Sequence, residues 1–346
     1  MDAPAPAPLL GTGLHAIGAG SAALCYAPQR YVRGWSWQTY WLVQAAGCWL
    51  ILPWIGAALT VPHLGAVLAE APRAAMLHSY LLGVAYGVGG IAFGVAIRYI
   101  GYSLTYAVAI GFSCVLGTLL PPALHGTLGS TLASTAGLYV VAGVFLGAAA
   151  MVVTGLAGLR KERETGGADA FNARVGLPIC FLAGVLSAVF GLSLDAGQPV
   201  ADVAARHGAG IFQGNVIYLF SNTGAFTTTL AYVVWLATRG RTWGEFGRAA
   251  AGGRLGRNYA LSALTGLLWY LQFFFYGLGH VHMGRFQFSS WAIHMIILIL
   301  FSTGFGVAIG EWRRCRNRTR FLVATALLLL FLAVGLITRG NQLAAT

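Results

Sequence analysis

Charged side chains are scarce in this chain of 346 residues. They make up 9% of it, while apolar and aromatic residues make up 58% and the mean hydropathy is +0.73. An ordinary soluble domain carries roughly 25% charged residues. A soluble fold of this size has too little interior to hide so many apolar side chains. Lipid is therefore the expected solvent, in which only helices or closed barrels satisfy their backbone hydrogen bonds.

The sequence also lacks the common catalytic and metal-binding signatures. It holds no His-Glu-x-x-His, no phosphate-binding Gly-x-x-x-x-Gly-Lys-Ser/Thr and no acidic cluster for Mg²⁺. The five cysteines are scattered singly without metal or redox spacing, so we interpret them as packing residues. No basic region precedes the first apolar stretch, so a cleaved signal peptide is not expected. We predict a protein that is not an enzyme and uses neither cofactor nor metal.

Long apolar segments, in contrast, are abundant. They reach roughly 20 residues, the length of a membrane-spanning helix, and do not alternate over about ten residues as barrel strands do. We predict an all-α integral membrane protein with ten transmembrane helices. The expected spans are Leu9–Ala27, Thr39–Val61, Leu77–Ile97, Tyr102–Pro122, Ala136–Leu159, Gly176–Ala196, Gly214–Thr238, Ala260–Val281, Ser290–Gly310 and Phe321–Arg339.

The positive charges lie almost entirely in alternate connections between these spans. A net charge of +12 in a soluble protein would suggest nucleic acid as a partner. Here, 17 of the 21 Lys and Arg residues occupy the first, third, fifth, seventh and ninth connections. Positive residues mark cytoplasmic loops. We therefore predict odd connections in the cytoplasm, both termini outside, the lipid bilayer as partner and no nucleic-acid binding.

The two halves of the chain share a pattern of small and aromatic residues. Five residues of the third span and its end recur 183 positions later, in the eighth span and just after it. The pairs are Gly83 and Gly266, Tyr86 and Trp269, Phe93 and Tyr276, Gly94 and Gly277, and Gly101 and Gly284. Five spans per half place the second copy upside down, which is typical of secondary transporters. We predict a five-helix repeat at residues 1–160, a cytoplasmic linker at 161–175 and an inverted five-helix repeat at 176–346.

Polar and aromatic side chains form stripes within the predicted spans, and intramembrane polar residues are the default functional candidates. The eighth span carries a stripe at steps of three and four, and the second adds Trp41 and Gln44. A sugar offers C–H faces to aromatic rings and hydroxyls to amides and neutral imidazoles, whereas an anion would require an intramembrane Arg or Lys. The alternative role of such residues is interhelical hydrogen bonding. The predicted substrate site comprises Trp269, Gln272, Tyr276, His280, Gln287, Trp291, His294, His15, Tyr86, Asn215, Tyr218 and Asn222.

A proton-driven carrier needs a titratable group that faces the substrate. No Asp or Glu lies in the middle of a predicted span. Histidine titrates close to working pH. The candidates for proton coupling are therefore His15, His294, His280 and Asp195, which ends the sixth span. Packing against neighbours is the alternative role for each histidine.

Several motifs in the first four spans and in the eighth and ninth are specific enough for comparison. They include His15-Ala-Ile-Gly-Ala, Trp35-Ser-Trp37, Leu52-Pro-Trp54, Arg98-Tyr-Ile-Gly101 and, most specific of all, Trp269-Tyr-Leu-Gln-Phe-Phe-Phe-Tyr276. These motifs resemble the bacterial L-rhamnose–proton symporter family of the drug/metabolite transporter superfamily. The resemblance implies ten helices in a five-plus-five inverted repeat. It also implies proton-driven uptake of L-rhamnose, a small neutral 6-deoxyhexose, across the bacterial inner membrane.

Two positions depart from that family's pattern. The family has Glu after Trp-Ser-Trp, where this chain has Gln38, and tends to have Asp where this chain has Gln287. Proton coupling or the preferred sugar would change if either acid serves the proton or the substrate. The alternatives are a drug/metabolite-type exporter and a proton-uncoupled sugar carrier on the same fold. Outside transport, the alternative is a membrane enzyme or scaffold.

Overall fold

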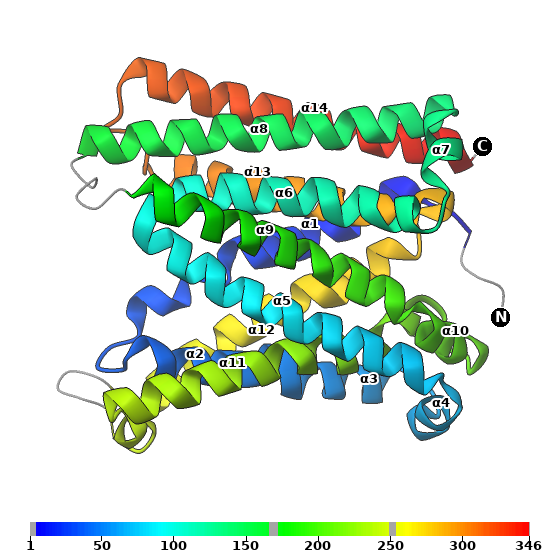
Figure 1. The fold of residues 1–346 in the computed structure, drawn as a ribbon, viewed down its shortest axis with the longest axis horizontal. Coiled ribbons are helices and arrows are strands. Elements are labelled where there is room, and N and C mark those ends of the chain that lie inside the picture. Colours follow the sequence, from blue (N-terminus) through cyan, green and yellow to red (C-terminus); the bar gives the residue numbers. More distant parts are fainter. Residues whose placement is uncertain (1–4, 166–171, 249–253, 346) are drawn as a thin grey trace. The chain divides into compact units, whose positions relative to one another are not determined.

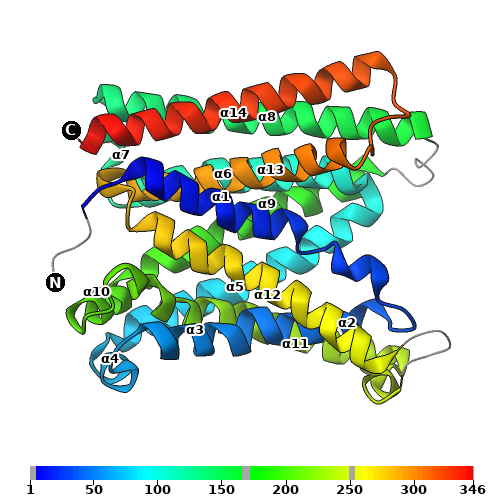
Figure 2. The same cartoon turned by 180° about the vertical axis from the view of Figure 1, so that it is seen from behind.

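The computed structural model describes residues 5–165, 172–248 and 254–345, and all regular structure in these residues is helical. This confirms the predicted all-α class (Figures 1 and 2). The longer helices are α1 (Pro8–Leu24), α2 (Trp37–Ala45), α3 (Leu52–Thr60), α5 (Arg73–Ile100), α6 (Tyr102–Leu124), α8 (Thr135–Thr165), α9 (Ala173–Ala196), α11 (Tyr218–Gly240), α12 (Leu255–His280), α13 (Ser290–Ala308) and α14 (Asn317–Ala345).

Nine helical stretches of the described residues are long and apolar enough to cross a membrane, and they match nine of the ten predicted spans. The predicted seventh span corresponds to α11, which has 23 residues and is not among the nine. Its length of about 35 Å exceeds a hydrocarbon core of about 30 Å. Its apolar character is reduced by polar residues, among them Asn222 and the run 227–229. α11 as a tenth span stays a prediction.

The helix of the second predicted span is not a regular α-helix along its whole length. Between α2 and α3 lies a π-helical turn, η2 (Ala46–Ile51). Pro53 follows it in the first turn of α3. Because a proline ring has no N–H and clashes with the carbonyl four residues earlier, here Trp49, it favours a widened turn just before it.

The connections contain short elements that hydropathy did not predict. Among the described residues, three of them are α-helices and four are 3₁₀ turns. They are η1 (Pro28–Tyr31), α4 (Leu64–Glu70), α7 (Leu128–Leu132), α10 (Gln198–Arg206), η3 (Gly210–Val216), η4 (Trp243–Phe246) and η5 (Gly284–Ser289), in which η3, η4 and η5 are 3₁₀ turns like η1. The predicted linker at 161–175 includes the end of α8 and the start of α9, and its residues 166–171 lie outside the described residues.

The described residues form two compact units. Unit 1 contains Ser21–Val88 and Ser193–Gly277, and unit 2 contains residues 5–20, Gly89–Leu192 and residues 278–345. Each unit therefore draws on both halves of the sequence. The four boundaries fall inside α1, α5, α9 and α12, so each of these helices contributes residues to both units.

In unit 2, α14 packs antiparallel along α8 (Figures 1 and 2). Small residues permit this contact. A Cβ atom on Gly143 would lie 2.9 Å from the carbonyl oxygen of Ala333, and one on Gly340 would lie 2.6 Å from that of Ala136. Backbones approach this closely in lipid because packing, rather than water exclusion, holds membrane helices together.

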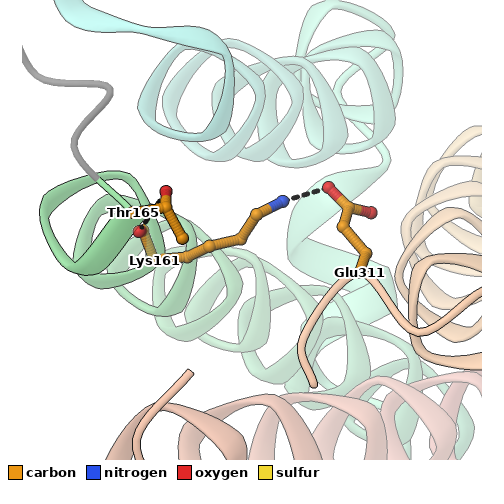
Figure 3. Close-up of polar contacts among 3 residues, drawn as sticks. All are labelled: Lys161, Thr165 and Glu311. Atoms are coloured by element: carbon orange, nitrogen blue, oxygen red, sulfur yellow. Dashed lines mark hydrogen bonds and ion pairs between the residues drawn. The ribbon is translucent and has the colours of Figure 1, made fainter. Parts of the chain in front are cut away.

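The same unit gathers the third, fifth and ninth connections at one end. Lys161 on α8 donates a hydrogen bond to Glu311 after α13, as Figure 3 shows. Glu164 accepts hydrogen bonds from the Arg316 N–H and the Thr319 hydroxyl, both at 2.8 Å. The Asn172 N–H donates to the Tyr99 carbonyl at 2.7 Å.

Unit 1 gathers the first and seventh connections in the same way. Glu245 of η4 accepts hydrogen bonds from the Ser36 N–H, the Ser36 hydroxyl and the Thr39 hydroxyl, at 2.7, 2.8 and 2.7 Å. The second and sixth connections meet at its other end, where His207 and Glu70 lie 3.0 Å apart and α4 packs on α10. Within each unit, odd-numbered connections thus lie together, as a common side of the membrane requires.

Candidate functional site

Aromatic rings from three segments of unit 1 meet around Trp269. The Trp269 ring centroid lies 5.2 Å from Tyr26, 6.0 Å from Trp41 and 5.7 Å from Trp49, with interplanar angles of 88°, 88° and 81°. Trp41 and Trp49 are 6.4 Å apart at 75°. Three indoles thus meet almost at right angles, and we call Trp41, Trp49 and Trp269 the indole corner.

The indole corner depends on the π-helical turn η2. Trp41 and Trp49 are eight positions apart, which in a regular helix would rotate them about 80° from each other. The additional residue accommodated by a π turn makes eight positions equivalent to seven, which returns Trp49 to the face of Trp41. Tyr86 on α5 extends the cluster, with its ring 6.5 Å from Trp49.

The remaining α12 candidates of unit 1 continue the stripe that begins at Trp269. Gln272 and Tyr276 are 8% and 7% exposed. Their spacing from Trp269 places all three on one helical face. The structure therefore presents a ring, an amide and a phenol in sequence along α12.

Three further candidates of unit 1 lie in η3 and α11, all of them buried. The Asn215 amide donates to the Thr60 hydroxyl at 2.9 Å. The Tyr218 ring lies 5.7 Å from Phe273, and a Cβ atom on Gly277 would lie 3.2 Å from the Tyr218 hydroxyl. Tyr218 thus packs on α12, whereas Asn215 is bonded to α3.

In unit 2, His15 of α1 and His294 of α13 lie together. Their ring centroids are 6.0 Å apart in an edge-to-face arrangement, and their exposures are 0% and 2%. A Cβ atom on Gly279 would lie 2.9 Å from His15 Nε2, so the backbone of α12 closes the third side. The structure thus brings two of the three candidate proton-coupling histidines together.

The other candidates of unit 2 lie at the start of α13 and just before it. His280 Nδ1 and the Ser290 hydroxyl share a hydrogen bond of 3.1 Å. The Trp291 indole N–H donates to the Ser113 carbonyl at 3.0 Å and to its hydroxyl at 3.2 Å. Gln287 lies in η5 and is half-buried. The Trp291 donor is thus bonded to α6, which leaves its ring face as the part able to contact a substrate.

Asp195 lies in the last turn of α9, within unit 1, and is exposed. It is in a different unit from the three histidines. Two residues of interest were not predicted from the sequence. Trp49 joins the indole corner only through the π turn, for which Pro53 was the available signal. Glu245, which bonds the start of α2, lies in a connection without a hydrophobic pattern.

These features define an α-helical, multi-pass membrane protein with aromatic, amide and imidazole side chains inside its helical units. The family model described as L-rhamnose-proton symport protein matches residues 5–343. L-rhamnose-proton symporters of Cronobacter sakazakii and Mannheimia succiniciproducens are 34% and 32% identical to the chain. The alignments cover 94% and 96% of this chain, and 96% and 98% of the relatives. The chain belongs to the L-rhamnose-proton symport protein family.

Proposed function

We propose that this protein is a secondary active transporter that imports L-rhamnose, or a closely related neutral deoxysugar, together with protons. Family membership over residues 5–343 is the observation that carries the proposal. The inner membrane of a bacterium is the proposed location, with both termini on the outer side. The gathering of odd connections within each unit supports this sidedness, because those connections hold 17 of the 21 Lys and Arg residues.

The twelve proposed substrate residues divide between the units. Unit 1 holds seven of them, all aromatic residues or amides, and unit 2 holds the three histidines together with Gln287 and Trp291. In unit 1 these are Trp269, Gln272, Tyr276, Tyr86, Asn215, Tyr218 and Asn222. Aromatic faces and neutral amides suit a sugar, and imidazoles suit a proton. The division supports substrate binding by unit 1 and proton binding by His15, His280 and His294 in unit 2.

The proposed transport mechanism is alternating access by two inverted repeats. The boundaries between units fall in the first, third, sixth and eighth spans. The sixth and eighth are the counterparts of the first and third when the second half repeats the first. Corresponding helices of the two halves therefore each contribute residues to both units, as expected of two repeats.

Uptake into proteoliposomes tests the proposal. We expect labelled L-rhamnose to accumulate when an inward proton gradient is imposed and to equilibrate without accumulation after a protonophore is added. Accumulation that ignores the gradient would contradict proton symport. Absence of uptake for every neutral hexose and deoxyhexose of a panel would contradict sugar transport.

A proton-uncoupled sugar carrier is the second candidate, and the surroundings of Gln38 favour it. The Gln38 amide donates to the Thr242 hydroxyl at 3.1 Å, so the position is occupied by a neutral, bonded group. The nearby carboxylate of Glu245 accepts three hydrogen bonds at the start of α2. If Gln38 marks lost coupling, the wild-type protein should exchange sugar rapidly and never concentrate it.

A further inference from the structure

Two indole N–H groups of the indole corner and one neighbouring amide are buried donors with no acceptor among the described residues. They are Nε1 of Trp49, Nε1 of Trp269 and Nε2 of Gln44. Gln44 is 0% and Trp49 is 4% exposed. A buried donor without a partner costs the full desolvation penalty of the group. Three in one cluster indicate a surface that is completed by acceptors from outside the protein.

The backbone places these donors around one helix crossing. A Cβ atom on Gly266 would lie 2.8 Å from the Gln44 carbonyl, and one on Gly47 would lie 3.8 Å from the Gly266 Cα. α12 thus passes directly over the junction of α2 and η2. Trp269 follows Gly266 by one helical turn on the same face. Gln44 and Trp49 approach that face from the other helix.

The Gln44 amide is hydrogen-bonded to Tyr40. The Tyr40 hydroxyl donates to Gln44 Oε1 at 3.0 Å, from one turn earlier on α2. The acceptor end of the amide is therefore used within the protein, and its N–H₂ end is the one left over.

We propose that Gln44, Trp49 and Trp269, with the ring faces of the indole corner, form the subsite that holds the sugar ring in unit 1. The inference rests on the proposed function and deepens it. The subsite offers only donors and aromatic faces. It therefore fits a ligand that presents hydroxyl or ring oxygens on one side and C–H groups on another, as a neutral 6-deoxyhexose does. An apolar drug has no acceptors for the three donors and would leave them unpaired.

The test is equilibrium binding of labelled L-rhamnose, and of a panel of other neutral sugars, to the purified full-length protein in detergent. Trp49→Phe keeps a ring and removes its donor. Tyr40→Phe/Gln44→Leu removes the Gln44 N–H₂ donor. It also removes the Tyr40 hydroxyl, which would otherwise lose its acceptor on Gln44. We expect each variant to raise Kd about tenfold, the effect of one lost hydrogen bond at the upper end of the usual range. Trp54→Phe, five residues along the same span and 45% exposed, is the matched control and should bind within about twofold of wild type.

Melting temperatures measured without sugar separate a binding role from a structural one. Tyr40→Phe/Gln44→Leu should melt at or above wild type, because it removes a buried unpaired donor and a hydrogen-bonded pair together. If both variants melt well below wild type, Trp269→Phe decides by the same Kd criterion. Wild-type affinity in variants that lack the donors would overturn the subsite.

The proposed function and the subsite fail differently. Wild-type protein that binds no sugar of the panel overturns both. Binding of another neutral sugar but not L-rhamnose overturns the rhamnose assignment alone, and the variants are then judged with that sugar. Sugar binding that is normal in wild type and weakened in the variants, without accumulation driven by the proton gradient, supports the subsite and contradicts symport.

Discussion

Replacement of Trp291 by Phe separates the packing of this residue from a role in binding the sugar. The Trp291 indole is 5% exposed, and its N–H is shared between the carbonyl and the hydroxyl of Ser113 on α6. Its ring lies 5.8 Å from Phe190. A Cβ atom on Gly117 would lie 2.6 Å from the Trp291 ring, so the pyrrole edge rests on the α6 backbone. Trp291 therefore joins α13 to α6.

The expected cost has two parts. The shared hydrogen bond contributes about 1 kcal/mol net. The loss of the pyrrole edge against Gly117 adds about 1–2 kcal/mol for a gap that the two helices close only partly. Trp291→Phe should therefore lower the free energy of unfolding by about 2–3 kcal/mol. Ser113→Ala removes only the hydroxyl half of the bond and should cost less than about 1 kcal/mol.

Unfolding by denaturant titration in mixed micelles, with both single variants and the double variant, measures these values. A coupling of at least about 0.5 kcal/mol between Trp291 and Ser113 is expected from their direct bond. Sugar Kd for Trp291→Phe should stay within about twofold of wild type in the folded fraction, because phenylalanine keeps an aromatic face for the proposed sugar contact. The reasoning is refuted if the variant unfolds within about 0.5 kcal/mol of wild type while its Kd rises tenfold, because the indole N–H would then serve the sugar.

Proton coupling, the start of α2 and the side of the C-terminus can each be tested separately. His294→Gln should abolish sugar accumulation driven by a proton gradient but leave sugar exchange, because glutamine fits beside His15 without titrating. Accumulation that is preserved in proteoliposomes would exclude His294 as the coupling group. Glu245→Ala should lower the free energy of unfolding by about 1–2 kcal/mol, because it removes three hydrogen bonds at the start of α2. In thermal melting in detergent, Glu245→Gln should lower the melting temperature less than Glu245→Ala does. A C-terminal alkaline phosphatase fusion should be active and a C-terminal green fluorescent protein fusion dark; the reverse would contradict outer termini.

The fold was predictable where lipid imposes one dominant constraint. Apolar length identified nine spans because each must satisfy its backbone within about 20 residues of hydrocarbon. α11 was harder to assign by hydropathy because residues such as Asn222 and Thr229 reduce its apolar character while remaining buried. The short helices α4 and α10 escaped prediction because their periodicity covers only about two turns, too little to stand out from a loop.

The geometry of the candidate site was predictable only along single helices. Helical spacing correctly placed Trp269, Gln272 and Tyr276 on one face of α12. The same rule separates Trp41 from Trp49, since it assumes 3.6 residues in every turn. The π turn changes that count locally, and its cause, Pro53, lies outside the turn itself. Contacts between helices, such as Trp291 with Ser113, depend on packing that no spacing within one span encodes.

α12 carries a candidate sugar residue and a candidate proton-coupling residue one turn apart. Tyr276 belongs to unit 1 and His280 to unit 2, and the boundary follows Gly277. A second glycine, Gly279, comes directly after it and packs against His15. Each glycine weakens a helix by about 1 kcal/mol relative to alanine, so bending is least costly at this turn. α12 therefore carries candidate residues of both units on successive turns, with its most easily bent turn between them.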